Sequence, residues 1–167
     1  MSEISLVPVT AENFSDLVEL IKQLAEYEHL DPPDETAQRR LLADLTGERP
    51  RIEAFLAVDT HHSSNSSNSS NSSNSLGYAI ILETYSSFLA LPTMYLEDIF
   101  VREDARKRGV GSLLFDHVVD LARSRGCGRV DWQVLDWNQL ARDFYERRGA
   151  SCMKEWMLYR IDLVSGQ

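Results

Sequence analysis

The chain has 167 residues, 43% of them hydrophobic and 26% charged, which is typical of a globular protein, so we expect a single domain over residues 1–167. It has no apolar run long enough to cross a bilayer, and its N-terminus lacks the basic flank and apolar stretch of a signal peptide. We therefore expect no membrane partner and a cytoplasmic location. The net charge is −9 without a concentrated basic run, which argues against a nucleic-acid partner.

The charge is distributed unevenly along the sequence. Residues 1–60 hold 13 acidic and 5 basic side chains, whereas residues 102–167 hold 10 acidic and 12 basic ones. This division suits a protein that meets a cation at one place and a phosphorylated molecule at another, although ordinary surface charge explains it equally well. Cys127 and Cys152 show no metal-ligand spacing, so we expect small apolar roles for them and no metal site.

The elements of the first 60 residues follow from hydrophobic periodicity. An alternating, β-branched run predicts a strand, and apolar residues at helical spacing predict a helix that Asp31-Pro32-Pro33 ends. The expected elements are a strand at 4–9, a helix capped by Thr10 and ending near 27–29, a polar helix at 34–45 closed by Gly47, and a strand at 53–58.

Residues 61–75 read HHSSNSSNSSNSSNS, a low-complexity run of Ser and Asn that cannot build a core. We expect a long flexible hairpin loop between two strands, lying within the single domain. His61 and His62 have no third ligand near them in the sequence, so we interpret them as solvated side chains.

The remaining sequence alternates strands with helices. The expected elements are strands at 76–85 and 94–101, a helix at 110–124, a strand at 130–135, a helix at 139–147 ending at Gly149, and a strand or hairpin at 151–162. Together with the first half, this order predicts an α/β fold with a mixed sheet and helices on both faces.

The basic turn between the strand at 94–101 and the following helix is the stretch most suited to binding a ligand. It reads Arg106-Lys107-Arg108-Gly109-Val110-Gly111-Ser112. Glycines allow a tight turn and close approach of a ligand, and the amides at the start of a helix favour an anion such as a pyrophosphate. The turn lacks the spacing of a nucleoside-triphosphate loop or a dinucleotide fingerprint, so taken alone a plain surface turn explains it equally well.

Four stretches in combination carry a family resemblance. They are Tyr95-Leu96-Glu97-Asp98-Ile99-Phe100-Val101, the R-x-x-G-x-G turn at 106–111, Trp137-Asn138-Gln139, and Phe144-Tyr145-Glu146-Arg147-Arg148-Gly149-Ala150. With them the chain resembles the GCN5-related N-acetyltransferase superfamily, and within it the diamine (spermidine/spermine or thialysine) acetyltransferases. The resemblance implies a mixed, splayed sheet in a single domain, acetyl-CoA as co-substrate and a homodimer. It also implies direct transfer of the acetyl group to a small amine in a ternary complex.

The resemblance also implies the catalytic residues. Tyr145 matches the tyrosine that protonates the departing thiolate, and its reference pKa of roughly 10 suits such an acid. Glu97 matches a carboxylate that acts as base through water. Strand alternation places Glu97 with Ile99 on one face and Leu96 with Asp98 on the other. A core position for Tyr145 and a salt bridge for Glu97 are the structural alternatives.

By the same resemblance, the cofactor lies along one strand and at the basic turn. Main-chain groups of the strand would pair with the pantetheine arm, and the amide of Phe100 would polarise the acetyl carbonyl. Asn138 matches a cofactor contact, and it is equally suited to cap the helix that follows it. The implied cofactor-binding residues are Ile99, Phe100, Val101, Arg106, Lys107, Arg108, Gly109, Val110, Gly111, Ser112, Asn138 and Tyr145.

The implied acceptor-binding residues are Tyr27, Glu28, Ser86, Glu97 and Asp98. Polyamine-type members carry an acidic residue after the tyrosine that matches Tyr85, and a tryptophan two positions further on. This chain has Ser86, Ser87 and Phe88 there, so we expect a diamine or an amino acid with a side-chain amine in preference to spermine. Two alternatives remain open: a regulatory module that binds acyl-CoA without turnover, and an acetyltransferase acting on protein lysines or N-termini.

Overall fold

The computed structural model describes residues 3–60 and 74–163, which form two compact units, Met1–Trp132 and Gln133–Gln167. The single domain expected over residues 1–167 stays a prediction. His61, His62 and the rest of the expected loop up to residue 73 lie outside the described residues. Ser75, assigned to that loop from the sequence, is instead the first residue of a strand.

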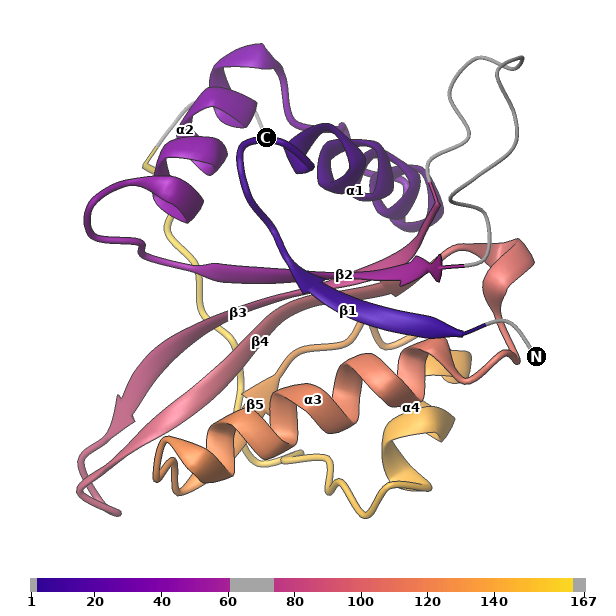
Figure 1. Ribbon diagram of the computed structural model, residues 1–167. Coiled ribbons are helices and arrows are strands. Elements are labelled where there is room, and N and C mark those ends of the chain that lie inside the picture. The colour runs from indigo at the N-terminus through magenta and orange to yellow at the C-terminus, as the bar shows by residue number, and fades with distance from the viewer. Residues whose placement is uncertain (1–2, 61–73, 164–167) are drawn as a thin grey trace, which may run out of the picture. The chain divides into compact units, whose positions relative to one another are not determined.

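The first unit is built on one five-stranded sheet whose strands follow the chain order (Figure 1). The first four strands pair antiparallel and the last pairs parallel to its neighbour, so the predicted mixed sheet is confirmed. The strands are β1 (Ile4–Pro8), β2 (Glu53–Asp59), β3 (Ser75–Ser86), β4 (Leu91–Val101) and β5 (Arg129–Trp132).

Helices cover both faces of this sheet, as the sequence predicts. Helices α1 (Phe14–Glu28) and α2 (Glu35–Thr46) lie on one face, and α3 (Val110–Ser124) lies on the other (Figure 1). Each of them buries an apolar stripe because its apolar residues recur with the helical period. The α1 face has a core that includes Leu17, Leu20, Tyr78, Ile80 and Phe100, and α3 buries Val110, Leu114 and Val118.

Short segments complete the two units. The first unit also contains a 3₁₀ turn, Glu103–Ala105, directly before the basic turn. The second unit holds helix α4 (Gln139–Glu146), and Gly149 beyond its end has a positive φ of 83°. Helix α4 and Gly149 agree with the predicted helix at 139–147 ending at Gly149, whereas the 3₁₀ turn was not predicted.

Three expectations about local structure are wrong. Thr10 is not the cap of α1: Asn13 occupies that position, and Thr10 stabilises the turn before it by accepting the amide of Glu12 on its hydroxyl. Strand β5 ends at Trp132 instead of 135, because its pairing with β4 stops there. Residues 151–162 form no strand, since none of the described residues of the second unit offers a strand to pair with.

Candidate active site

A β-bulge places the two neighbouring carboxylates of β4. Ile80 of β3 pairs with Asp98, but Ile81 pairs with Leu96, so Glu97 is an extra residue without a partner in the ladder. Because of the bulge, the side chains around Glu97 do not alternate between the two faces of the sheet as the sequence predicts. Asp98 therefore lies on the α1 face with Phe100, whereas Leu96 faces α3, and Glu97 between them is exposed.

Asp98 is held on the α1 face by a buried tyrosine. The hydroxyl of Tyr78, a residue with no exposed surface, donates to Oδ2 of Asp98 at 3.3 Å. Burial, with a contribution from the negative charges of Glu97 and Glu28, raises the pKa of Asp98 to about 6, although the hydrogen bond from Tyr78 lowers it in part. The pKa of Tyr78 is raised as well, chiefly by burial, so its hydroxyl stays protonated and remains a donor.

The end of α1 contributes to the same place. Burial raises the pKa of Glu28, which acts on Asp98 and Tyr78 through its charge. The guanidinium of Arg106 lies 5.3 Å from the ring centre of Tyr27, a cation–π contact. Glu28, Glu97 and Asp98 therefore lie within range of one another's charge and are called the carboxylate cluster below, while Tyr27 lies beside the basic turn.

One side of β4 is open where the sequence predicts the pantetheine arm. Strand β5 pairs with β4 only from Thr93 to Leu96, so among the described strands the stretch 98–101 pairs with β3 alone, and Glu97 before it pairs with neither strand. A strand with one unpaired edge accepts an extended chain through its main-chain groups. The predicted positions Ile99, Phe100 and Val101 lie on this stretch, and Arg106 Nε donates to the carbonyl of Val101 at 3.4 Å.

The basic turn has the backbone of an anion-binding loop. Lys107 and Gly109 both have left-handed φ values, 63° and 84°, and α3 begins at Val110 directly after them. Left-handed residues beside right-handed ones turn successive amides toward one concave side, next to the positive end of the helix dipole. This geometry fits the pyrophosphate that the sequence places at residues 106–112.

The basic side chains of the turn are not equally available to bind a phosphate. Arg108 contacts Asp59 Oδ2 at 2.6 Å, whereas Lys107 forms no ion pair with any described residue. The expected direct phosphate contact of Arg108 is therefore a prediction that competes with its ion pair.

Tyr145 and Asn138 belong to the second unit and are described within it. Asn138 caps α4 by accepting the amide of Ala141 on Oδ1 at 3.2 Å, which confirms the capping interpretation, while its cofactor contact stays a prediction. Tyr145 is buried, 8% exposed, with its ring 5.4 Å from that of Phe144. Its role as acid likewise stays a prediction.

Ser86 stands apart from the other predicted acceptor residues of the first unit. It lies at the far end of the β3–β4 hairpin, is 5% exposed, and accepts the amide of Leu89 on its hydroxyl at 3.3 Å. Ser86 lies six residues along the strand from Ile80, about 20 Å at the usual rise per residue. Within one chain Ser86 therefore supports a turn and does not join the carboxylate cluster.

Comparison with known proteins identifies the family of this chain. The model of the acetyltransferase (GNAT) family matches residues 27–150, which include the cluster, the open edge, the basic turn and Tyr145. The chain belongs to the acetyltransferase (GNAT) family. The predicted family and the predicted N-acetyltransferase activity are thereby confirmed, and members of this family use acetyl-CoA as co-substrate.

Individual relatives of this GNAT enzyme are amine acetyltransferases. Thialysine N-epsilon-acetyltransferase of Bos taurus is 31% identical over 150 residues, covering 88% of this chain and 85% of that protein. L-ornithine N5-acetyltransferase NATA1 of Arabidopsis thaliana is 47% identical over 85 residues, covering 51% of this chain and 37% of that protein. The chain thus spans well under half the length of the second relative.

Solved structures confirm the fold of this GNAT enzyme. An integron cassette protein from V. cholerae has a TM-score of 0.76 at 25% identity, covering 97% of this chain and 93% of its own. A probable acetyltransferase has a TM-score of 0.77 at 22% identity, covering 97% of this chain and 99% of its own.

The GNAT site contains two residues that the sequence reading did not single out. Tyr78 holds Asp98, and Asp59 holds Arg108. Tyr78 carries the one polar side chain in the apolar run Leu76–Leu82, a signal that could have marked it. Asp59 is the last residue of a strand, and an acidic residue at a strand end gives no sequence signal of a functional role.

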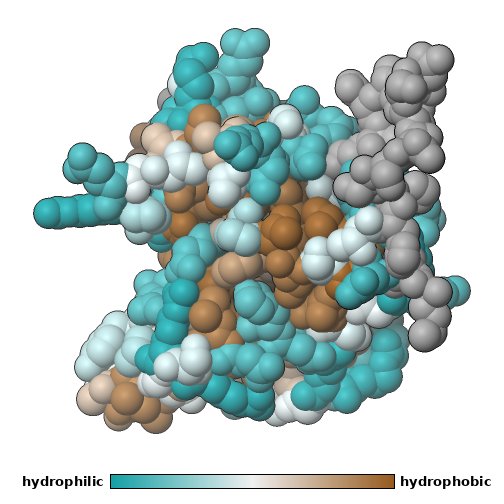
Figure 2. Space-filling model, viewed as in Figure 1, coloured by the Kyte–Doolittle hydropathy of each residue, from teal (hydrophilic) through white to brown (hydrophobic). Residues whose placement is uncertain are grey.

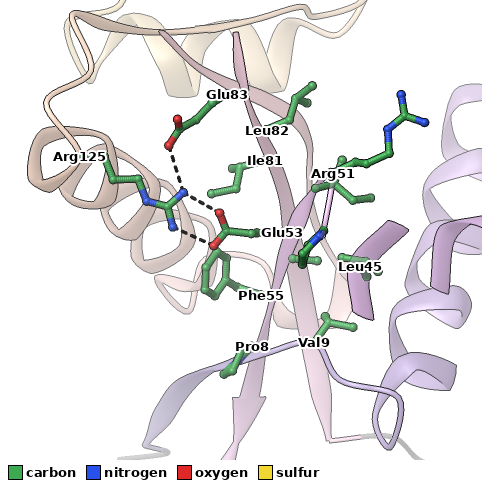
Figure 3. A pocket seen from close by; sticks show the side chains of 13 residues that line it. Pro8, Val9, Leu45, Arg51, Glu53, Phe55, Ile81, Leu82, Glu83 and Arg125 are labelled. Atoms are coloured by element: carbon green, nitrogen blue, oxygen red, sulfur yellow. Dashed lines mark hydrogen bonds and ion pairs between the residues drawn. The ribbon is translucent and has the colours of Figure 1, made fainter. Parts of the chain in front are cut away.

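A separate hollow lies away from this site. It has a volume of about 520 Å³ and is lined by residues near the start of β2 and the middle of β3, together with Pro8, Leu45 and Arg125. Arg125 binds Glu53 and Glu83 there, so the acidic groups of the hollow are already paired (Figure 3). None of the predicted site residues lines it. Among the described residues no helix is long and apolar enough to span a membrane, and no group of three potential ligands could hold a metal.

Proposed function

We propose that this GNAT enzyme transfers the acetyl group of acetyl-CoA to a small amine that carries a second charged group. The acceptor would be a diamine, a polyamine or an amino acid of the thialysine type, with short acceptors preferred to spermine. The observation that carries the proposal is the carboxylate cluster of Glu28, Glu97 and Asp98 beside the open edge of β4. Three acidic side chains attract an ammonium group, and the names of the thialysine and ornithine relatives support the same acceptor class.

The reaction needs a free amine, whereas an alkyl ammonium has a reference pKa of roughly 10.4. Glu97, exposed at the bulge, would take this proton directly or through water, and Asp98 is a second acceptor because its pKa of about 6 lies near the working pH. The amine nitrogen would then attack the acetyl carbonyl directly. The C–N bond forms, the C–S bond breaks, and no residue of the chain is acylated on the way.

Binding of acetyl-CoA would rest on two features of the first unit. The open stretch 98–101 of β4 would pair with the pantetheine arm, and the amides of the turn at Lys107–Gly109 would receive the pyrophosphate. Acetyl-CoA supplies the activated acetyl thioester. Tyr145 would give its phenolic proton to the departing thiolate and Asn138 would touch the cofactor, in keeping with the family motif.

The first test is an assay of thiol release from acetyl-CoA with a panel of amines: thialysine, lysine, ornithine, putrescine, spermidine, spermine and a histone-tail peptide. We expect turnover on thialysine or a short diamine, and little on spermine or the peptide. Binding of CoA without turnover on any amine would contradict the proposal and favour a regulatory module. Preference for the peptide would favour a protein acetyltransferase.

The role of Tyr145 is tested by Tyr145→Phe. Loss of the phenolic proton should lower kcat by roughly 10–10⁴-fold and leave the Kd for CoA unchanged, because the ring and its packing remain. Tyr159→Phe is the control, since Tyr159 lies in the second unit but is 86% exposed. Unchanged turnover in Tyr145→Phe would remove Tyr145 from the mechanism.

We also propose that the enzyme is a cytoplasmic homodimer. The end of the β3–β4 hairpin carries an exposed apolar patch of Tyr85, Phe88, Leu89 and Leu91, visible in Figure 2, and Phe88 is 97% exposed. Exposed patches of this kind mark protein contacts. Sedimentation velocity should give a dimer that Phe88→Ser shifts toward monomer, and a monomeric parent protein would contradict it. The free Cys127 and Cys152 suit a reducing compartment, which cell fractionation would test.

A further inference from the structure

A buried carboxylate outside the catalytic motifs holds the middle of the basic turn. Asp59, the last residue of β2, is only 5% exposed and accepts from Arg108 Nη2 at 2.6 Å. Its backbone is fixed in the sheet, since it pairs with Ile4 of β1 and its amide donates to the carbonyl of Asn74. The carboxylate is therefore a rigid anchor, and a charge-assisted bond of this length is a strong one.

The turn needs such an anchor because its backbone is strained. Lys107 has a Cβ and a φ of 63°, a conformation that residues other than glycine adopt rarely and hold only where the surroundings impose it. Arg108 lies between Lys107 and Gly109, the two left-handed residues. A bond from the side chain of Arg108 to the end of β2 thus acts at the centre of the strained segment.

The neighbouring strand reaches the same basic segment. Arg102 Nη1 donates to the carbonyl of Ser75, the first residue of β3, at 3.4 Å, while its Nη2 binds Asp104 at 2.7 Å. The end of β2 and the start of β3 are adjacent in the sheet, so both strands at this end of the hairpin bond to the residues that precede α3.

We propose that Asp59 is a positioning residue for acetyl-CoA: by fixing Arg108 it holds the turn Lys107–Gly109 in the conformation whose amides receive the pyrophosphate. This inference rests on the proposed function. Arg108 then serves the cofactor through the shape of the turn, and Lys107, which forms no ion pair with any described residue, is a cation that can meet a phosphate. Asp59 itself touches neither the cofactor nor the acceptor.

A second ion pair between β2 and an arginine next to α3 offers a matched control. Asp59 and Glu53 lie at opposite ends of β2, and each pairs with an arginine next to α3, Arg108 before the helix and Arg125 after it. Glu53 binds Arg125 through both carboxylate oxygens, so it also ties the sheet to the helix. Only the Asp59 pair acts on the turn.

The test measures CoA binding by calorimetry, and initial rates with acetyl-CoA and the best acceptor, for the full chain and its variants. Asp59→Asn should raise the Kd for CoA and the KM for acetyl-CoA by about tenfold, and leave kcat and the acceptor KM within about twofold. Asp59→Glu should restore part of the affinity. Glu53→Gln should lower the thermal midpoint yet bind CoA like the parent, which separates positioning from stability.

A double variant keeps the test decisive where one substitution weakens the fold. If Asp59 acts through Arg108, Asp59→Asn combined with Arg108→Gln should bind CoA no more weakly than Arg108→Gln alone. The inference is overturned if Asp59→Asn binds CoA like the parent, if Glu53→Gln weakens binding equally, or if the two effects simply add. Failure of the parent protein to bind CoA would instead overturn the proposed function, so the two failures are distinguishable.

Discussion

Among single residues, Asp98 lowers the stability of the folded state at neutral pH, where the proposed reaction uses its carboxylate. Its folded pKa of about 6 lies above the ordinary value of 3.8, mainly because of burial. The folded state therefore binds its proton more tightly, and this contribution to stability is present below about pH 4 and lost as the pH rises through 6. Asp98→Asn keeps an acceptor for Tyr78 and removes the buried charge, so it should stabilise the protein by about 1 kcal/mol at pH 7. Urea unfolding at pH 7 and pH 4 checks this, since the gain should vanish at pH 4.

The interaction between the two neighbouring carboxylates should appear in the pH dependence of the rate. If the ionised form of Asp98 is required, kcat/KM should fall below pH 6 with an apparent pKa of about 6. Glu97→Gln removes a negative charge that raises the pKa of Asp98, so it should move this inflection to lower pH. Asp98→Asn should abolish it. An inflection that stays in place in Glu97→Gln would show that the two carboxylates are not coupled.

Thr93 offers a stability test away from the site. It is 1% exposed, and its Oγ1 is buried without a hydrogen bond to any described residue. Thr93→Val replaces the unsatisfied hydroxyl by a methyl group of the same shape and should stabilise the protein by about 1 kcal/mol. Thr84 pairs with Thr93 across the strands but is exposed, and its hydroxyl donates to the carbonyl of Thr93 at 3.5 Å, so Thr84→Val is the control and should give no stabilisation. Equal effects of the two in thermal unfolding would exclude this explanation.

At the scale of elements, substitutions of two glycines at the ends of α3 should distinguish an effect on CoA binding from an effect on stability. Gly109 and Gly126 have φ values of 84° and 70°, and an added Cβ would meet no atom within 4 Å at either. Alanine at each position should therefore cost only backbone strain, about 1 kcal/mol. Gly109→Ala should also raise the Kd for CoA about fivefold or more, because it disturbs the amides of the turn. Gly126→Ala should leave this Kd unchanged, and calorimetry with CoA checks both.

Elements with a strong period of their own could be predicted from the sequence. Helix α3 runs over Val110–Ser124 as predicted, because its apolar stripe and flanking glycines are local signals. The bulge at Glu97 could not be predicted, since it depends on the register between β3 and β4. The predictions for the end of β5 and for residues 151–162 were wrong for the same reason. A strand forms only with a partner strand, and the partner is distant in the sequence.

At the scale of the whole molecule, the predicted site is partly assembled by the fold. Tyr27 and Glu28 lie far from Glu97 and Asp98 in the sequence, and the family motif pointed to both pairs. In the structure the charge of Glu28 raises the pKa of Asp98, so these two residues lie within range of each other's charge. The supporting residues Tyr78 and Asp59 were not predicted because no motif includes them. Ser86, an expected acceptor-binding residue, lies along the strand from the cluster.

The acidic cluster should make recognition of the acceptor depend on salt. The enzyme carries a net charge of −9, and an exposed carboxylate at Glu97 adjoins partly buried Glu28 and Asp98. A dicationic diamine should gain more from this potential than a monoamine of equal length, so salt at about 0.5 M should raise its KM several-fold more. Glu28→Gln should flatten the dependence for the diamine and leave the monoamine nearly unaffected. Equal salt slopes for the two acceptors in the parent enzyme would mean that the second ammonium binds away from the cluster.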